Sequence, residues 1–296
     1  MPNDRLAVLP QYLLPKGAVT RLAGRVASAR SDTGPTRLIR WFVARYGVDM
    51  SEAAEPDIAA YATFNDFFTR ALKPGARPLA QADLVCPVDG AISQFGRIRG
   101  TQIVQAKGHD YSTQALVGGD STLAARFDDG YFATLYLSPK DYHRIHMPCA
   151  GRLQRMIHVP GELFSVNPTT ARGVPGLFAR NERVVCVFEG DAGPFVLVLV
   201  GATIVGSMAT VWHGVVNPPR PGSVREWRYD NGGEGAPVEL EQGAEMGRFL
   251  LGSTVVLLFP DGGLQFNPAW MPGSTIRMGE MMARRWVTRA GDRGRT

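Results

Sequence analysis

The spacing of apolar residues changes near residue 80, and the change divides the chain into two predicted regions. Between residues 16 and 50, apolar side chains recur at helical spacing, which predicts two helices separated by a break at 31–35. A third helix is predicted over 57–72, where Thr63 or Asn65 could cap its start. Proline and glycine residues follow and end the helical period.

From residue 84 onward the pattern predicts short strands separated by Gly, Pro and Asp turns. The predicted strands are 84–88, 91–98, 131–137, 151–158, 184–189, 195–200, 238–240 and 255–259. Short strands with few helices between them favour a β-rich sandwich or barrel-like body. The predicted fold is therefore α+β, with an N-terminal helical region at 1–80 and a β-rich catalytic body at 81–296. The basic, aperiodic segment 282–296 is predicted to be a loosely held tail.

The net charge of the chain limits the classes of molecule that it is expected to bind. The chain has 296 residues and a net charge of +5, which favours nucleic acid, anionic lipid or a phosphorylated substrate. Helix-turn-helix, zinc-finger and aromatic–basic patterns are missing from the sequence, so nucleic acid is the weakest of these. The three cysteines are far apart and form no CxxC motif, which indicates a reducing compartment and no disulfide framework.

The basic residues of the helical region suit a lipid surface. They accompany an aromatic pair in an amphipathic pattern, although two surface helices packed on a globular body would fit equally well. The residues predicted to face a membrane are Arg21, Arg25, Arg37, Arg40, Trp41 and Phe42. The amino terminus lacks the features of a signal peptide, and the apolar run 195–211 contains two glycines, so it is predicted to form two buried strands rather than a span.

Four stretches of the body could carry chemistry. Asp89 begins an Asp-Gly pair, which by itself is typical of a hairpin turn. His143 and His146 lie three residues apart; no third metal ligand is convincingly placed, so a base with an orienting partner is favoured and no metal is predicted. The loop 164–178 carries aromatic and aliphatic residues expected to be exposed, and could form the lip of a site or a plain connection. His213 could line a pocket or fill the core.

The segment 243–259 provides a fifth candidate. Glycine-rich residues lead into a β-branched apolar run over 254–259, which predicts a buried strand with Ser253 at the junction before it. Gly252 has no Cβ, so the peptide bond between Gly252 and Ser253 can be approached closely, although a turn with a capping hydroxyl would look the same. The GxSxG, GxxxxGK[ST] and GxGxxG motifs are not found in the sequence. The usual sequence signatures of a serine hydrolase, a P-loop nucleotide-binding protein and a dinucleotide-binding protein are therefore missing.

Several motifs together resemble the bacterial and mitochondrial phosphatidylserine decarboxylases. They are LGST at 251–254 preceded by GAEMGRF, FFTRALKPGARPL at 67–79, PVDG at 87–90, YHRIHMPCAG at 142–151, FSVNP and LFARNERV within 164–184, and VGATIVGSMATVW at 200–212. The similarity runs from the YLLPKGAVTRLAG segment to the TIRMGE segment. One departure is Gln242, where the family often has lysine.

The resemblance implies an enzyme that makes its own pyruvoyl cofactor by cleavage between Gly252 and Ser253. Ser253 would be the nucleophile and the cofactor precursor, His146 the base and Asp89 the carboxylate that orients it. His143 would handle substrate or transfer a proton during decarboxylation. The products of cleavage would be a β chain of residues 1–252 and an α chain of residues 253–296.

The resemblance also implies partners and a location. The substrate would be phosphatidylserine, converted to phosphatidylethanolamine in phospholipid biosynthesis, and the enzyme would form a homodimer on the cytoplasmic face of the cell membrane as a peripheral protein. Two other classes remain open from the residues alone. One is a serine hydrolase with an Asp89, His146 and Ser253 triad, and the other is a noncatalytic membrane-binding β protein.

Overall fold

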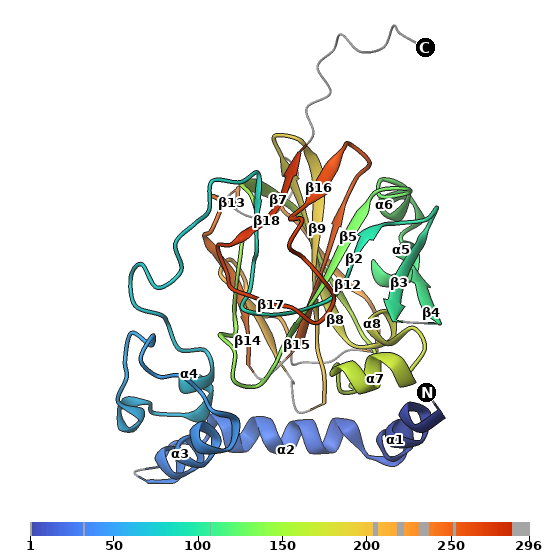
Figure 1. Cartoon of the computed structure of the whole chain (residues 1–296). Helices are drawn as coiled ribbons and strands as arrows, with labels where there is room; N and C mark the ends of the chain where they lie inside the picture. Colours follow the sequence, from blue (N-terminus) through green and yellow to red (C-terminus); the bar gives the residue numbers. More distant parts are fainter. Residues whose placement is uncertain are drawn as a thin grey trace, which may run out of the picture.

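The first part of the chain is helical and lies at one end of a β-rich body. The computed structural model describes residues 2–31, 33–106, 108–203, 207–217, 222–230, 237–250 and 253–285. The N-terminal elements are α1 (Pro2–Leu13), α2 (Lys16–Ser28), α3 (Gly34–Tyr46), the 3-10 turn η1 (Ile58–Ala60) and α4 (Phe64–Phe68). Helices α1, α2 and α3 run along the base of the body in Figure 1. The predicted α+β class is confirmed.

The predicted N-terminal helices are found with one large change of length. Helices α2 and α3 confirm the two helices expected between 16 and 50, and α3 ends at Gly47, which adopts a left-handed conformation with φ of 66°. The helix predicted over 57–72 is wrong in extent, because only α4 and η1 form there. Thr63 caps α4 by accepting a hydrogen bond from the backbone N–H of Asp66. Leu72 instead forms a β-bridge with Ala53, so the chain has left the helix by that point.

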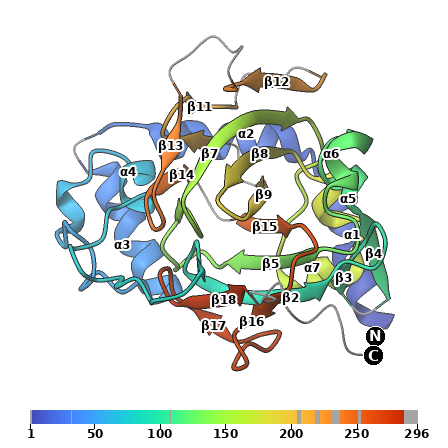
Figure 2. The ribbon, with the colours of Figure 1, turned by 90° about the horizontal axis from the view of Figure 1, so that it is seen from above.

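The largest sheet has nine strands, and its described pairs are antiparallel. Its order is β12-β7-β8-β9-β15-β5-β2-β17, with β13 also paired to β7. The strands are β2 (Gly90–Arg97), β5 (Tyr131–Leu137), β7 (Gly151–Val159), β8 (Arg183–Gly190), β9 (Gly193–Val200), β12 (Arg225–Arg228), β13 (Glu239–Leu240), β15 (Ser253–Phe259) and β17 (Thr275–Ile276). From above, these strands curl around an interior that the smaller sheets help to close (Figure 2).

Three smaller sheets and four short helices complete the body. The four-stranded sheet contains β11 (Gly214–Val215), β10 (Met208–Thr210), β14 (Glu245–Phe249) and β6 (Arg144–His146). The three-stranded sheet contains β1 (Leu84–Val85), β18 (Met281–Arg285) and β16 (Leu264–Phe266), and β3 (Gln102–Ala106) pairs with β4 (His109–Ser112). The helices are α5 (Thr113–Leu116), α6 (Ser121–Ala125), α7 (Pro168–Gly173) and α8 (Leu177–Arg180).

Each predicted strand is found, with shifts at its ends, and the run 195–211 contains two strands, β9 and β10, as expected. Two predictions about connections are wrong. Asp89 and Gly90 do not form a hairpin turn, because β1 pairs with β18 while β2 pairs with β5 and β17. The predicted tail begins too early, because residues up to Arg285 belong to β18; the rest of that segment lies outside the described residues.

Three groups of buried apolar side chains stabilise this arrangement. One contains residues from alternate positions of the curled sheet and from the smaller sheets, and a second covers the other face of the sheet beneath α5, α7 and α8. The loop 164–178 belongs to the second group: Phe164, Val166 and Phe178 are buried there, so the prediction that its apolar residues are exposed is wrong. The third group joins α2, α3 and α4. Strand β15 is buried along its whole length between β5 and β9, as its β-branched sequence predicts.

Candidate active site

Ser253 is the first residue of β15, the central strand of the curled sheet. It pairs with Leu137 on β5, and it is 1% exposed. Its hydroxyl has no hydrogen-bond partner among the described residues. Buried hydroxyls normally have a partner, and an exception requires an explanation such as a catalytic role. Gly252 lies outside the described residues, so the predicted cleavage bond is described only on its Ser253 side.

His146 is held on β6 by contacts on three sides. Its Nδ1 lies 2.8 Å from the carbonyl oxygen of Gly243, and its Nε2 lies 3.0 Å from the hydroxyl of Tyr142. Its backbone N–H donates to the carbonyl of Pro87. Because a carbonyl can only accept, the ring proton is assigned to Nδ1, and Nε2 accepts a hydrogen bond from Tyr142. The nitrogen that could act as a base is therefore Nε2.

Burial lowers the pKa of His146 below its ordinary value of 6.5. The hydrogen bond to Gly243 and the nearby Glu245 and Asp89 carboxylates act in the opposite direction. Burial is the largest effect, so the ring is neutral near pH 7. A neutral imidazole with an available lone pair is the form that general-base catalysis requires.

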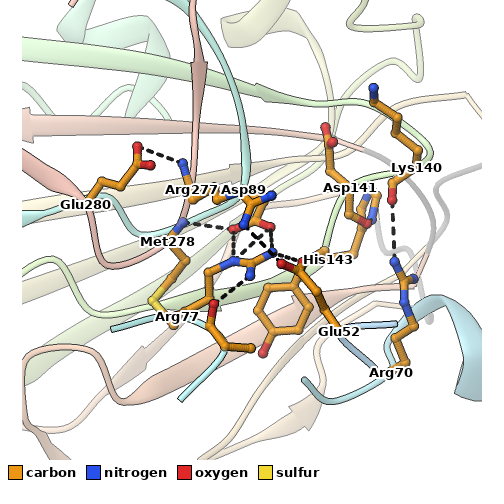
Figure 3. A network of polar contacts seen from close by, with 12 residues as sticks. Glu52, Arg70, Arg77, Asp89, Lys140, Asp141, His143, Arg277, Met278 and Glu280 are labelled. Carbon is orange, nitrogen blue, oxygen red and sulfur yellow. Dashed lines mark hydrogen bonds and ion pairs between the residues drawn. The ribbon is translucent and has the colours of Figure 1, made fainter. Parts of the chain in front are cut away.

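Asp89 does not contact His146 in this structure. Its carboxylate receives hydrogen bonds from the Nε and Nη2 atoms of Arg77 and from the backbone N–H of Met278 (Figure 3). The expected hydrogen bond between Asp89 and the imidazole is replaced by the one from Nδ1 to Gly243. Asp89 nevertheless lies two residues beyond Pro87, whose carbonyl binds His146, and its charge still acts on the imidazole through space.

His143 is fully buried beside the ring of Phe68, with 4.0 Å between the ring centroids. Its Nδ1 lies 2.7 Å from the carbonyl oxygen of Asp141, so Nδ1 carries the proton. Nε2 has no partner among the described residues. Burial lowers the pKa of His143 to about 3. The resting ring is therefore neutral, and Nε2 is a proton acceptor rather than a donor.

The segment before β14 shapes the surroundings of His146. Gly243 has φ of 80°, and a Cβ at this position would lie 2.6 Å from the side chain of Leu79, so a glycine is required here. The amide of the preceding Gln242 donates to the carbonyl oxygens of Ala82, Asp83 and Pro148. A lysine ammonium has three N–H donors and the glutamine amide has two, one of which is shared between two of these carbonyls, so both side chains can serve the same three acceptors.

A cavity of about 360 Å³ opens beside this cluster, between the N-terminal region and the body. Asp89, Asp141 and Tyr142 line it from the body, and Arg70 lines it from the segment after α4. Arg70 is buried, and its Nη2 makes a long hydrogen bond to the carbonyl of Lys140. A small polar group could enter this cavity. Of the four candidate residues only Asp89 lines it, whereas Ser253, His143 and His146 lie outside its lining.

The residues predicted to face a membrane divide into two groups. Arg21, Arg25, Arg37 and Arg40 are exposed, and Trp41 is 56% exposed. Phe42 is buried among Phe64, Phe67 and Phe68, so its predicted outward position is wrong. No described helix has the length and hydropathy needed to cross a bilayer.

Sequence reasoning missed the residues that contact the expected ones. Arg77 binds Asp89, Tyr142 binds His146 and Gly243 fixes the His146 tautomer. Arg77 and Tyr142 lie inside the FFTRALKPGARPL and YHRIHMPCAG motifs. Their place in these motifs is the sequence feature that could have identified them as site residues. His213 is exposed and packs against Trp227, away from these contacts. In the described part of the chain, no three His, Cys, Asp or Glu side chains are grouped to hold a metal ion.

Comparison with known proteins covers both regions of the chain. A family model described as phosphatidylserine decarboxylase matches residues 64–284, and a model described as PSD matches residues 6–47. The phosphatidylserine decarboxylase proenzyme of Albidiferax ferrireducens is 77% identical over 281 residues, covering 95% of this chain and 98% of the relative. Those of an Azoarcus species and of Polaromonas naphthalenivorans are 73% and 74% identical, each over 95% of this chain and over 96% and 97% of the relatives.

Proposed function

The chain belongs to the phosphatidylserine decarboxylase family, and on that premise we propose that it makes a pyruvoyl cofactor from its own Ser253 by breaking the Gly252–Ser253 peptide bond. The protein is an enzyme of phospholipid biosynthesis that converts phosphatidylserine to phosphatidylethanolamine and CO₂. Beyond this activity, we propose the pyruvoyl cofactor, the roles of individual residues and binding to a membrane surface. We also propose two regions, a helical one at 1–80 and a catalytic body at 81–296.

The observation that carries the cofactor proposal is the unpaired hydroxyl of Ser253. A buried hydroxyl without a partner costs about 1–3 kcal/mol, yet here it stands at the serine of the LGST motif. Conversion of that residue to a pyruvoyl group removes the hydroxyl and its unmet hydrogen bonds. The site therefore fits the group. Denaturing electrophoresis of the wild-type protein beside Ser253→Ala is the experiment that tests the proposal.

The cleavage needs a base for the Ser253 hydroxyl, and His146 suits that role. In the proposed step Nε2 takes the proton from Oγ, and the oxygen attacks the carbonyl carbon of Gly252. The imidazolium then returns a proton to the departing amide nitrogen. Elimination of the new Gly252 carboxylate, followed by hydrolysis with loss of ammonia, leaves the keto group at position 253. For a direct transfer the Tyr142 hydroxyl, which donates to Nε2, has to turn away.

Two other groups support His146 in this step. The carbonyl of Gly243 keeps the proton on Nδ1 and so directs the basic lone pair to Nε2. The Asp89 carboxylate stabilises the imidazolium through space, since its charge raises the pKa of His146 against the effect of burial. The role of Asp89 is thus electrostatic, while the backbone sets the tautomer.

In decarboxylation, a pyruvoyl group at position 253 would supply a carbonyl that can bind the lipid amine and draw electrons from the bond to CO₂. The protein's own task is to move protons, and His143 suits it. Nε2 of His143 is buried and has no partner among the described residues, and burial makes it a weak base when no substrate is bound. The substrate carboxylate, bound beside the ring, would raise its pKa, so that Nε2 takes the proton that the headgroup ammonium must lose. Once the carboxylate has left as CO₂, we assign to His143 the return of this proton to the former α-carbon of the serine headgroup. A general acid of this kind contributes about 10²- to 10⁴-fold in rate.

The maturation rate is expected to fall with decreasing pH, with its midpoint below pH 6.5. Burial lowers the pKa of His146 below its ordinary value, so the basic neutral form predominates at pH 6.5 and above and is lost as pH falls through the lowered pKa. The measurement is the fraction of freshly synthesised precursor cut per unit time between pH 5 and pH 8. A midpoint above pH 6.5 would contradict the assignment of His146 as the buried base.

The proposed location is the cytoplasmic face of the cell membrane, where the enzyme binds peripherally to reach its lipid substrate. The N-terminal helices expose apolar side chains that a soluble surface does not need: Leu13 is 88% exposed, Leu22 is 64% exposed and Trp41 is 56% exposed. Exposed arginines lie on the same helices α2 and α3. Apolar side chains inserted at a lipid interface and basic side chains beside its headgroups are the two contributions to interfacial binding.

Replacing Arg21, Arg25, Arg37 and Arg40 with glutamine is expected to weaken binding to vesicles that contain anionic lipid by at least about tenfold. Each basic residue near such a surface contributes about 1 kcal/mol, and the contribution is screened by salt. Vesicle co-sedimentation at low and high salt is the measurement. The matched control replaces four arginines of the β-body, Arg97, Arg126, Arg228 and Arg284, which are also exposed. Equal loss of binding in the two variants would mean that only total charge matters and that the helices are not the binding surface.

A further inference from the structure

Arg77 holds the Asp89 carboxylate from one side in a nearly dry ion pair. Its Nε lies 2.9 Å from Oδ1 and 3.1 Å from Oδ2, and its Nη2 lies 2.5 Å from Oδ2. The side chains of Arg77 and Asp89 are 6% and 11% exposed. The backbone N–H of Met278 approaches Oδ1 from another direction at 2.8 Å. Asp89 is therefore fixed in position by charge-assisted hydrogen bonds, which are the strong class.

The guanidinium is shared with a second carboxylate that comes from the N-terminal region. Arg77 Nη2 lies 2.8 Å from Oε2 of Glu52, and the other oxygen of Glu52 lies 3.0 Å from Nη1 of Arg277 (Figure 3). The hydrogen bond to Asp89 is the largest of the effects that raise the pKa of Arg77, so this side chain remains charged. Because Arg277 also contacts Glu52, the four connected side chains are two carboxylates, Glu52 and Asp89, and two guanidiniums, Arg77 and Arg277, which carry no net charge.

Asp89 is the member of this network whose charge acts on the proposed base. The Pro87 carbonyl that binds the backbone of His146 is two residues before Asp89, and the Asp89 charge raises the pKa of His146. A carboxylate that acts through space has no hydrogen bond to the imidazole that would hold it in place. Its position must therefore come from other contacts, and Arg77 supplies most of them.

We propose that Arg77 is a positioning residue for self-cleavage, which holds the Asp89 carboxylate in place so that the imidazolium of His146 is stabilised. The inference rests on the proposed function, because it assumes that His146 is the base of cleavage at Gly252–Ser253. Arg77 does not touch the reacting atoms. Its effect is exerted only through Asp89.

The test follows maturation of freshly synthesised full-length chain in Arg77→Gln, Arg77→Lys and Arg277→Gln, by denaturing electrophoresis from pH 5.5 to 8.5. Arg77→Gln is expected to mature at least about tenfold more slowly than wild type. The loss should be smaller than the roughly 10⁴-fold that follows removal of the carboxylate itself from a serine-enzyme triad, because Asp89 is still present. Arg77→Lys keeps the charge without the fork geometry and should recover part of the rate. Arg277→Gln, which loses a contact to Glu52 but none to Asp89, should mature like wild type.

A double variant separates positioning from a general loss of structure. In an Asp89→Asn background, Arg77→Gln should cause no further slowing, because the carboxylate through which Arg77 acts is already gone. The same fold-loss in both backgrounds, or a wild-type rate for Arg77→Gln across the pH range, would overturn the proposal. A wild-type chain that never divides would instead overturn the proposed self-cleavage itself, so the two failures can be told apart.

Discussion

Ser253→Ala is expected to abolish cleavage and decarboxylation together, leaving a single chain of 296 residues where wild type gives chains of 252 and 44 residues. Alanine removes the only hydroxyl at the proposed bond and leaves the buried start of β15 otherwise unchanged. The smaller wild-type chain should resist amino-terminal sequencing, because a keto acyl group replaces its amine. Denaturing electrophoresis, intact mass and CO₂ release measure the three consequences on one preparation.

Thr254 provides a matched control for this experiment. Its hydroxyl is also buried and lacks a partner among the described residues, but successive side chains of a strand point to opposite faces. Thr254→Val keeps the β-branched shape and should be cut and active. A divided, active Ser253→Ala protein would remove Ser253 from the mechanism. An undivided wild type that hydrolyses added esters would favour the serine hydrolase alternative.

Replacing the two histidines separately is expected to block two different reactions. His146→Asn should leave the precursor whole, because loss of the base in a nucleophile–base pair costs about 10⁴-fold or more. His143→Asn should be cut normally and then release CO₂ about 10²- to 10⁴-fold more slowly, the usual worth of a positioned proton donor. The difference follows from their contacts. Gly243 fixes the tautomer of His146 and the Asp89 charge raises its pKa, whereas the Nε2 of His143 is buried and has no partner among the described residues.

The measurements are the ratio of cut to uncut chain and the rate of CO₂ release per cut chain. His213→Asn is the control, since His213 is exposed and packs on Trp227. Thermal unfolding of each variant identifies any general loss of stability. If His143→Asn also failed to mature while remaining folded, the division of labour between the two histidines would be wrong.

The strands were predictable because each one depends on the composition of its own short segment. Seven consecutive residues from Ser253 to Phe259 are small, β-branched or apolar, and a strand buried on both faces needs that composition. The extent of the helix expected over 57–72, by contrast, depends on a contact with another segment. Its apolar residues Phe64, Phe67 and Phe68 do face α3, but Leu72 pairs with Ala53, a contact that the helical pattern cannot indicate.

The candidate site was predictable in its residues but not in its contacts. The motifs that resemble a known family identify Ser253, His143, His146 and Asp89 by position in the sequence. The partners of those residues come from distant segments: Gly243 is 97 residues from His146, and Met278 is 189 residues from Asp89. Pairings of this kind depend on how the curled sheet closes, so the replacement of the Asp89–His146 hydrogen bond by two separate contacts needed the structure.

The position of β15 between β5 and β9 determines what would happen to the small fragment after scission. Ser253 to Phe259 form seven register pairs with β5, Thr254 to Leu258 form five with β9, and β17 and β18 pair with β2 and β1. The 44-residue chain would thus pair with strands of the larger chain at several separate places, and its new amino terminus would be the buried residue 253 at the start of β15. Mature protein should migrate as one particle in size-exclusion chromatography and come apart only when the whole body unfolds.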